Sequence, residues 1–391
     1  MRSRQRLLIQ IIILLPAIAI FLLLVGFRST GGEPPIKSPA QPAGTFPNSE
    51  APTFNDILHS LPPKSTLGVV KGEKTIAPQV PAPITRLQNK IVEYDLTVRE
   101  TSAKIAPNLT YQSLWAFDGV VPGPVMRVKV GDVLRLTLHN SDKNVTGHNI
   151  DLHFIDGACG GCADTCVKPG QTRTIEARAL YPGIFMYHCA YHQQGNILAV
   201  HIANGMYGFL IVDPQIPLPK VDHEFMLIEG EFYVQRAGRN IGSLSYKDLV
   251  DEKPTYVFFN GKHADLTPPL TIRTNQRIRL YVGRGGVNGT CAFHVIGTIF
   301  DKVYPGGGTL NSPIERGIQT VNVPPGGGTI VEFVSPVPGT LIAVDHNLSR
   351  VCFKGLGQTF NVIGPPNPEI YESIGSDQSS QSASTKEAKA H

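Results

Sequence analysis

The chain carries little net charge for its length, and this excludes some classes of function. Its 391 residues include 35 lysines and arginines against 31 aspartates and glutamates, a formal net charge of +4. Proteins that bind nucleic acid generally show a much stronger basic excess, so we expect no nucleic acid partner. The sequence also lacks the motif Cys-x-x-Cys-His, which is the signature of covalently attached haem.

Glycine and proline, by contrast, are abundant. The chain holds 39 glycines and 32 prolines, and they interrupt nearly all of its short runs of alternating apolar residues. Such runs between turn residues predict short β-strands in place of helices. A length of 391 residues is enough for two domains with additional tails. We therefore expect an all-β protein with two domains.

Residues 1–27 form a separate segment. Three arginines precede a stretch from Leu7 to Phe27 that contains no charged residue. As a helix at ~1.5 Å per residue it reaches about 30 Å, the hydrocarbon thickness of a bilayer. A cleaved signal peptide is the alternative, but its apolar part is usually only ~7–15 residues long, and no clear cleavage site follows. We expect one N-terminal transmembrane helix in the cytoplasmic membrane, with the rest of the chain on the extracytoplasmic (periplasmic) side.

Two further segments have the composition of tethers. Residues 28–85 are rich in proline, glycine, serine and threonine and show weak periodicity, which predicts a partly extended spacer. Residues 366–391 are polar and serine-rich, which predicts a disordered tail.

The region between these tethers repeats itself. Phe117-Asp118-Gly119 in the first copy corresponds to Phe259-Asn260-Gly261 in the second. Tyr181-Pro182-Gly183 leads into His188-Cys189, and Val337-Pro338-Gly339 leads into His346-Asn347. An ordered series of matches at similar offsets indicates an internal duplication. We expect two tandem Greek-key β-sandwiches, one over residues 86–215 and one over residues 216–365.

Four residues of the first copy have the side chains and the order of a blue-copper site, which uses a thiolate, two imidazoles and a thioether. The candidate ligands are His148, Cys189, His201 and Met206. His192 competes with His201, because Cys-x-x-His is also a blue-copper spacing. We expect His201 as the ligand, because Met206 follows it at the expected distance and nothing equivalent follows His192. His192 is otherwise an extra ligand or a donor-docking residue.

A second metal is indicated on the opposite face of the same strands. Successive side chains of a β-strand point to opposite faces, so His188 faces away from Cys189. By the same alternation, His153 faces away from His148, and Asp151 shares its face. Two imidazoles then lie beside a carboxylate. A metal with open positions next to an acid is what small-molecule chemistry needs.

The second copy lacks the thiolate. Asn347 stands where the first copy has Cys189, so we expect no blue copper there. This copy keeps His294 and His346, and we expect them to serve the open metal of the first copy.

These motifs resemble those of the copper-containing nitrite reductases over roughly residues 90–364. The matching motifs are His-x-x-Asp-x-His (148, 151, 153), His-Cys (188, 189), His-x-x-x-x-Met (201, 206), His-x-Ile (294, 296) and Val-x-His-Asn (344, 346, 347). The resemblance implies two cupredoxin-like domains with one type 1 and one type 2 copper per subunit. It assigns His148, Cys189, His201 and Met206 to the type 1 copper.

The resemblance also implies how the second copper is completed and used. Its ligands would be His153 and His188 with His346 of the partner subunit, in a homotrimer. Asp151 and His294 would handle protons above this copper, and Thr320 would orient His294. Ile296 and Val344 would form the wall against which nitrite lies.

The reaction implied by the resemblance is the dissimilatory reduction of nitrite to nitric oxide. One electron would pass from an extracytoplasmic donor through the type 1 copper to nitrite at the type 2 copper. The donor would be a c-type cytochrome or a small blue-copper protein.

Five further cysteines have no place in this scheme. Cys159, Cys162 and Cys166 are close in sequence, and an oxidising compartment favours a disulfide between two of them, although the sequence does not show which. A third metal site would lack a fourth ligand nearby. Cys291 and Cys352 flank His294 and His346, and either a second disulfide or two buried thiols is compatible with that position.

Two other functions compete with nitrite reduction. A multicopper oxidase that reduces oxygen needs paired His-x-His motifs and a His-Cys-His, but the chain has no His-x-His, and residue 190 is alanine. A membrane-tethered copper electron carrier or copper store would need only the four type 1 ligands. The hypothesis of a carrier or store does not explain five further residues, which are Asp151, His153, His188, His294 and His346.

Overall fold

The computed structural model describes residues 54–192, 197–309 and 313–374. The predicted transmembrane segment, residues 1–27, lies outside them. Among the residues that are described, no helix has both the length and the apolar character that crossing a bilayer requires.

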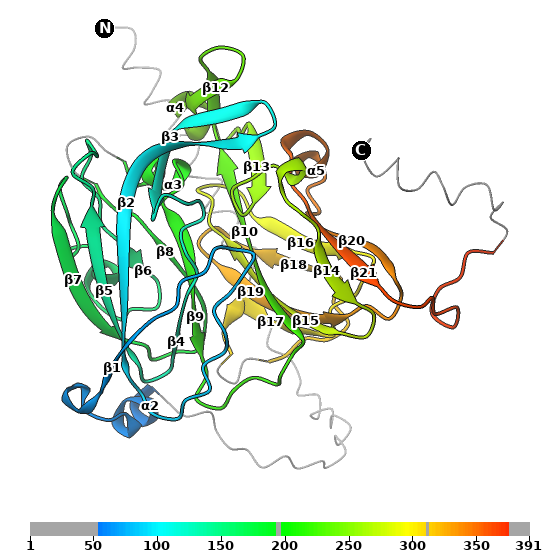
Figure 1. Cartoon of the computed structure of the whole chain (residues 1–391), viewed down its shortest axis with the longest axis horizontal. Helices are drawn as coiled ribbons and strands as arrows, with labels where there is room; N and C mark the ends of the chain where they lie inside the picture. Colours follow the sequence, from blue (N-terminus) through cyan, green and yellow to red (C-terminus); the bar gives the residue numbers. More distant parts are fainter. Residues whose placement is uncertain (1–53, 193–196, 310–312, 375–391) are drawn as a thin grey trace, which may run out of the picture. The chain divides into compact units, whose positions relative to one another are not determined.

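Strands dominate the described residues and form four sheets, as shown in Figure 1. The first sheet has the order β11-β12-β3-β2-β5-β7, with β1 also paired to β2. Its strands are β1 (Val69–Lys71), β2 (Ile91–Ala106), β3 (Leu109–Phe117), β5 (Val133–Asn140), β7 (Thr172–Arg178), β11 (Val234–Arg236) and β12 (Ile241–Leu244). The second sheet, β4-β9-β8-β6, consists of β4 (Met126–Lys129), β6 (Asp151–Leu152), β8 (Gly183–His188) and β9 (Tyr207–Asp213).

The other two sheets come from the second half of the chain. The third has the order β13-β10-β15-β19-β17. Its strands are β10 (His223–Phe232), β13 (Tyr256–Phe259), β15 (Arg277–Arg284), β17 (Lys302–Tyr304) and β19 (Gly328–Val334). The fourth has the order β14-β21-β20-β16-β18. Its strands are β14 (Leu270–Arg273), β16 (Cys291–Ile296), β18 (Thr320–Val323), β20 (Gly339–Asp345) and β21 (Gln358–Ile363).

The described helices are short and connect the strands. The α-helices are α2 (Phe54–Ser60), α3 (Leu198–Ala203), α4 (Tyr246–Val250) and α5 (Ser349–Lys354). The 3-10 helices are η1 (Lys64–Thr66), η2 (Ala158–Gly161), η3 (Ala264–Leu266) and η4 (Pro305–Gly307). The position of α3 between β8 and β9 matches that of α5 between β20 and β21, as a duplicated module requires.

Each pair of sheets encloses its own apolar core. In the first sandwich, Leu136 of β5 and Leu210 of β9 belong to one buried cluster. In the second, Leu280 of β15 and Phe360 of β21 belong to another. The predicted all-β architecture of two sandwiches is therefore confirmed at this level. Alternation explains the first core, because Leu134, Leu136 and Leu138 are buried while the residues between them are partly exposed.

A third apolar cluster joins the two sandwiches through their inner sheets. It includes Met186 of β8 and Phe209 of β9, packed with Ile228 of β10 and Tyr281 of β15. Strand β9 is buried along its whole length, because both of its faces are covered. Strand β8 thus lies between the first core and this interface. Its side chains face two different environments.

Two segments extend the first sandwich beyond its predicted limits. Residues 69–71 lie in the predicted spacer but pair in parallel with β2, and Ile57 of α2 contributes to the first core. The hairpin of β11 and β12, which follows the second sandwich's first strand, pairs in parallel with β3. The first sheet is thus built from both halves of the chain.

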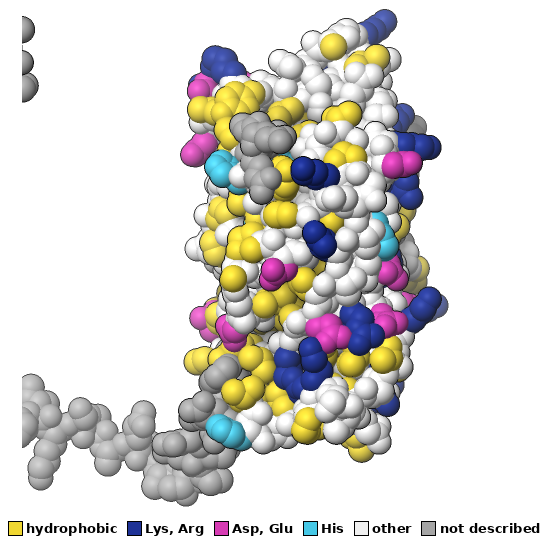
Figure 2. Space-filling view, turned by 90° about the vertical axis from the view of Figure 1, so that its left-hand side faces the viewer, with side chains coloured by type: hydrophobic (Ala, Val, Ile, Leu, Met, Phe, Trp, Pro, Cys, Tyr) yellow, Lys and Arg dark blue, Asp and Glu magenta, His cyan; other side chains and the backbone are white. Residues whose placement is uncertain are grey.

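The outer face of the first sandwich carries charges of both signs. Figure 2 views the molecule from the side on which β7 lies in Figure 1 and shows basic and acidic side chains interspersed. On neighbouring strands, Arg135 pairs with Glu93 at 2.7 Å and with Glu176 at 2.6 Å, and Lys64 also pairs with Glu176.

Candidate metal centres

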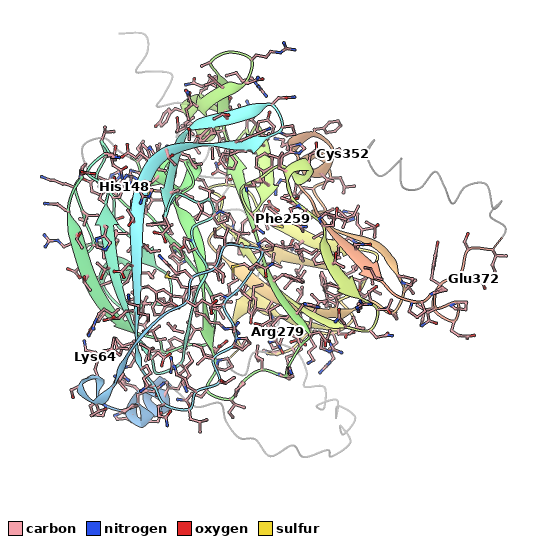
Figure 3. All side chains as sticks on the ribbon, in the orientation of Figure 1. Lys64, His148, Phe259, Arg279, Cys352 and Glu372 are labelled. Carbon is pink, nitrogen blue, oxygen red and sulfur yellow. A yellow bond between two sulfur atoms is a disulfide. The ribbon has the colours of Figure 1, made fainter. Side chains whose placement is uncertain are left out.

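Three metal-binding side chains converge inside the first sandwich. The Cys189 Sγ atom lies 3.3 Å from His201 Nδ1 and 3.9 Å from His148 Nδ1, and the two Nδ1 atoms are 3.3 Å apart. All three side chains are fully buried, and Figure 3 shows where His148 lies in the first sandwich. The fourth predicted ligand, Met206, is also fully buried and belongs to the same core cluster as Cys189.

Short connections place these residues. Cys189 directly follows β8, and its N–H donates to the carbonyl of Met206 at 3.1 Å. The N–H of Met206 in turn donates to the carbonyl of His201, on α3, at 3.1 Å. His148 is held by a two-way backbone bridge to Val167, with hydrogen bonds of 3.0 and 2.8 Å. The donor atoms are therefore arranged by backbone hydrogen bonds that do not depend on a metal.

The protonation states of these groups suit a metal. A carboxylate oxygen of Glu100 lies 3.2 Å from His148 Nε2 and accepts a hydrogen bond from it. The lone pair of the ring is then on Nδ1, where it is free for a metal. Burial, with a smaller contribution from the neighbouring His148, lowers the pKa of His201 to about 3, so His201 is neutral at physiological pH. Burial raises the pKa of the Cys189 thiol to about 12. A bound cation is therefore needed to make the thiolate.

A second group of donors lies on the opposite face of β6 and β8. His188 Nε2 is 3.0 Å from His153 Nε2 and 3.7 Å from Asp151 Oδ2. His188 Nδ1 donates to the carbonyl of Cys189 at 3.2 Å, so Nε2 carries the lone pair. Burial lowers the pKa of His188 against the raising effect of that hydrogen bond. His188 is buried and His153 is exposed, so the group opens to the surface.

The two histidines of the second copy also come together. The rings of His294, on β16, and His346, just after β20, have centroids 5.6 Å apart. His294 Nδ1 donates to the carbonyl of Gln319 at 2.6 Å, which leaves its Nε2 free. His346 is exposed. Among the described residues, the group formed by Asp151, His153 and His188 does not include it.

Strand pairing places the predicted pocket residues around His294. Thr320 is its cross-strand partner on one side and Val344 its partner on the other. Val344 is fully buried, whereas Ile296 is 45 % exposed. The carbonyl of Gln319, next to Thr320, is the group that holds the ring of His294. Sequence reasoning did not anticipate Gln319, because a backbone carbonyl leaves no trace in residue identity.

The cysteines and His192 take distinct places. Cys159 and Cys162 form a disulfide, as expected for two of the three neighbouring cysteines, and Cys166 is a free thiol. Cys291 and Cys352 are also free, so the alternative of a second disulfide is wrong. Cys291 is buried but Cys352 is exposed, so the alternative of two buried thiols is wrong as well. His192 is exposed and lies outside the group around Cys189.

In the second sandwich, a charge network fills the corner that faces α5. Glu229, Cys291 and Asp345 are buried with their ligand atoms close together. Arg350 lies 3.0 Å from Glu229 and also pairs with Asp345, and Arg284 lies 3.5 Å from Glu229. Two guanidinium groups therefore supply the positive charge that these carboxylates need.

Sequence reasoning missed three residues around the first centre. Glu100 binds His148, Asn149 Oδ1 lies 3.5 Å from the Cys189 sulfur, and the ring of Trp115 packs 4.8 Å from that of His201. Asn149 had a sequence signal, because a polar residue directly follows the predicted ligand His148. Trp115 is the single tryptophan of the chain, which is a weak signal. Glu100 lies 48 positions from His148 and had no signal.

Together, the fold and the two donor groups define a two-domain copper protein of cupredoxin type. The set of two imidazoles, a thiolate and a buried thioether is suited to a blue copper, and the imidazole group beside a carboxylate is suited to a copper with open positions. No sulfur belongs to the second group, so the two centres differ in kind.

Comparisons with known proteins give the family. Residues 97–216 match the family model described as multicopper oxidase. The copper-containing nitrite reductase of Neisseria gonorrhoeae is 37% identical, over 89% of this chain and 87% of its own length. That of Alcaligenes faecalis is 30% identical, over 73% of this chain and 79% of its own. The solved structure of copper nitrite reductase from Nitrosomonas europaea has a TM-score of 0.64 at 30% identity and covers 72% of this chain and 96% of that one. The chain belongs to the copper-containing nitrite reductases.

Proposed function

We propose that the chain reduces nitrite to nitric oxide, with one electron and two protons consumed and one water released. The observation that carries this proposal is the position of two consecutive residues. Cys189 belongs to one donor group and His188 to the other, on opposite faces of one strand. Adjacent Cα atoms are only ~3.8 Å apart, so the two centres are joined by a very short covalent path. The name that the curated relatives carry supports the same reaction.

Copper, when bound, supplies one-electron chemistry and a positive charge that favours an anion. The chain's own residues supply the protons and the orientation. Asp151 lies 3.7 Å from His188, so its carboxyl group is beside the site where the anion would sit. We assign it the role of proton donor. His294 presents Nε2, because Nδ1 is engaged by Gln319. We assign it the second proton-handling role.

We also propose that the second centre is completed between subunits of a homotrimer. His153 and His188 supply only two imidazoles, whereas catalytic metals such as zinc usually take three protein ligands. His346 is exposed and lies outside their group within the described part of one chain. Its exposure makes it available to a partner subunit. Leu348, two positions after His346 in the sequence, is an apolar side chain that is 48 % exposed on the same surface loop.

The protein's location remains a proposal that rests on sequence. Residues 1–27 have the length and composition of a membrane anchor, with the sandwiches on the extracytoplasmic side. An electron donor on that side, a c-type cytochrome or a small blue-copper protein, would complete the reaction. Fractionation of cells that express the full chain, or a chain lacking residues 1–27, tests the anchor. We expect only the full chain in the membrane fraction, and equal distribution of the two would contradict it.

Copper content and turnover test the function directly. The purified protein should bind two copper ions per chain and show two distinct electron paramagnetic resonance signals. With a reduced donor and nitrite, a nitric oxide electrode should record one nitric oxide per electron. A single copper signal, or consumption of donor without nitric oxide, would contradict the proposal.

A further inference from the structure

The loop of residues 157–162 closes on itself directly behind Asp151. A disulfide joins Cys159 to Cys162, whose Cα atoms are 5.2 Å apart. Cys159, Gly160 and Gly161 all have positive φ, at 53°, 51° and 92°. Three successive left-handed residues, one of them not glycine, form a backbone that a free chain rarely adopts. The disulfide ties the two ends of this turn together.

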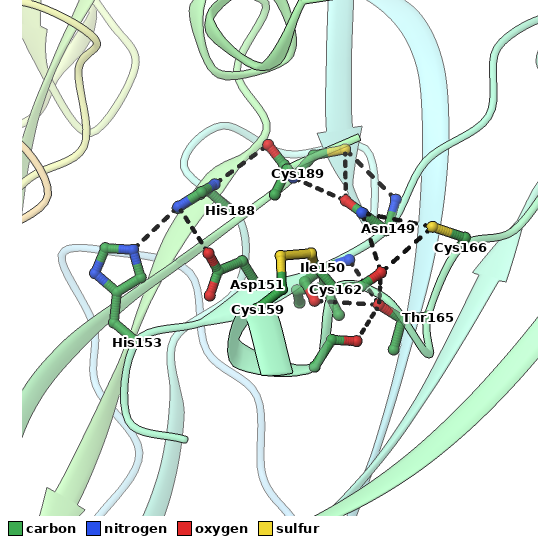
Figure 4. The surroundings of a disulfide bond; sticks show 12 residues. Asn149, Ile150, Asp151, His153, Cys159, Cys162, Thr165, Cys166, His188 and Cys189 are labelled. Atoms are coloured by element: carbon green, nitrogen blue, oxygen red, sulfur yellow. Dashed lines mark hydrogen bonds and ion pairs between the residues drawn. A yellow bond between two sulfur atoms is a disulfide. The ribbon is translucent and has the colours of Figure 1, made fainter. Parts of the chain in front are cut away.

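Gly160 forms the wall behind the Asp151 carboxylate. A Cβ atom added at Gly160 would lie 2.0 Å from Asp151 Oδ1 and 3.0 Å from the carbonyl oxygen of Leu152. The other carboxylate oxygen, Oδ2, is 3.7 Å from His188 Nε2. The carboxyl group is therefore confined between the loop and the imidazole, as Figure 4 shows. Only glycine leaves room for this arrangement.

The far end of the same loop is attached to the strand that carries Asp151. The Thr165 hydroxyl accepts from the N–H of Ile150 at 3.0 Å and lies 3.0 Å from the carbonyl of Gly161. The side chain of Asn149 donates to the carbonyl of Cys162 at 3.1 Å. Thr165 and Asn149 are both buried. These contacts fix the Cys162 end of the loop next to β6, and the disulfide links the Cys159 end to it, with Gly160 between the two.

We propose that the Cys159–Cys162 disulfide and Gly160 form a positioning clamp that holds the Asp151 carboxyl group in place for proton transfer. The inference rests on the proposed role of Asp151 as proton donor. Proton transfer needs a donor within hydrogen-bond reach, and a misplacement of ~1 Å can cost about 10²-fold in rate. The clamp residues touch no substrate. They act through Asp151.

Two independent variants open the clamp. Cys159→Ser with Cys162→Ser removes the tie, and Gly160→Ala pushes a methyl group into the carboxylate. Gly157→Ala is the matched control, because its φ of 175° suits any residue and its added Cβ would meet only Ile155 at 3.5 Å. Copper content, the visible spectrum and the trimer's size should stay unchanged in all of them.

The decisive readouts are turnover, its pH profile and its dependence on Asp151. We expect kcat to fall roughly 10- to 100-fold in both clamp variants, with a displaced pH profile, and to stay at the parent value in Gly157→Ala. When the clamp substitutions are made in the Asp151→Asn variant, we expect them to lower kcat by less than about threefold more. The reason is that the clamp and Asp151 act on the same proton-transfer step.

Three results would overturn the inference, and they differ from one another. Equal losses with and without Asp151 would mean that the clamp acts through another group. Loss of copper in both clamp variants would mean that the loop supports the metal centres and not the acid. A loss below tenfold for Asp151→Asn alone would remove the proposed role of Asp151, and with it the function assigned to the clamp.

Discussion

At the scale of single residues, the two centres share one device. In each, a hydrogen bond to one ring nitrogen leaves the other nitrogen of the imidazole free for a metal. Glu100 does this for His148 and the carbonyl of Cys189 does it for His188. In the second case, the backbone carbonyl of Cys189, a residue of the first centre, orients the ring of the adjacent His188 in the second centre.

Cys189 should control the colour of the protein and the entry of electrons. Cys189→Ala removes the only sulfur anion among the donors of the first group, and the thiolate is the ligand responsible for intense visible absorption of blue copper. We expect that band to disappear while the second copper remains and donor-driven nitrite reduction stops. Visible spectra and copper analysis check this. A variant that stays blue or green would contradict the ligand assignment.

Asp151 should give a proton without holding a metal. Asp151→Asn keeps the shape of the side chain and removes the acid, and general acids typically contribute ~10²–10⁴-fold. We expect kcat to fall within that range with both coppers bound. Steady-state turnover together with copper analysis measures the two effects separately. A change of less than tenfold would transfer the role to another residue.

At the scale of the elements, strand alternation made most of the site predictable. Because side chains alternate along β8, the sequence alone separated Cys189 from His188 and placed the two metals on opposite faces. The same rule, applied to residues 148–153, placed Asp151 and His153 on one face, although only Asp151 and Leu152 form the strand β6. The loop of residues 157–162 could not be predicted, because its course depends on which cysteines pair and on three positive φ angles.

Pairings between distant strands could not be predicted from the sequence either. β1, which pairs with β2, lies in the predicted spacer, and β12, which pairs with β3 of the first sandwich, lies in the range predicted for the second sandwich. Such parallel pairings depend on where the sandwiches leave an edge free. The charge network around Glu229 likewise forms from five separate elements: β10, β15, β16, β20 and α5.

That network should make stability depend on pH. Burial raises the pKa of Glu229 to about 7, although Arg284 and Arg350 oppose the shift and Asp345 adds to it. In the unfolded chain a glutamate has a pKa of ~4.3. The carboxyl group of Glu229 therefore binds a proton more tightly in the folded state than in the unfolded state. The stability that this protonation contributes is fully present below about pH 4.3 and is lost as the pH rises toward 7.

Glu229→Gln removes this dependence. We expect the stability of Glu229→Gln relative to the parent protein, followed by thermal unfolding, to increase between pH 5 and pH 8. The increase should correspond to a free energy of unfolding of on the order of 2–3 kcal/mol. Glu224→Gln is the control: burial raises the pKa of Glu224, but Arg127 and Arg279 outweigh burial and hold it below the usual range. The difference in stability between Glu224→Gln and the parent should stay constant over the same pH interval. If the difference in stability between Glu229→Gln and the parent also stayed constant, the proposed pH dependence of the network would be wrong.

At the scale of the whole molecule, duplication explains the division of labour. The first sandwich holds the donors of one centre and three groups of the other, and the second holds His294 and His346. The apolar interface between β8 and β9 on one side and β10 and β15 on the other is fully buried. It keeps the two halves of one chain in a fixed arrangement. A catalytic site completed by a partner subunit would then need only a defined trimer contact.

Complementation between inactive subunits tests this central claim most directly. His153→Ala and His346→Ala should each abolish nitrite turnover and lower the occupancy of the second copper, with the visible spectrum intact. After the two variants are mixed and subunit exchange is verified, random trimers should contain intact ligand sets at about a quarter of their sites. We predict recovery of nitric oxide formation to about a quarter of the parent rate. No recovery after verified exchange would show that each site lies within one subunit and would contradict the account.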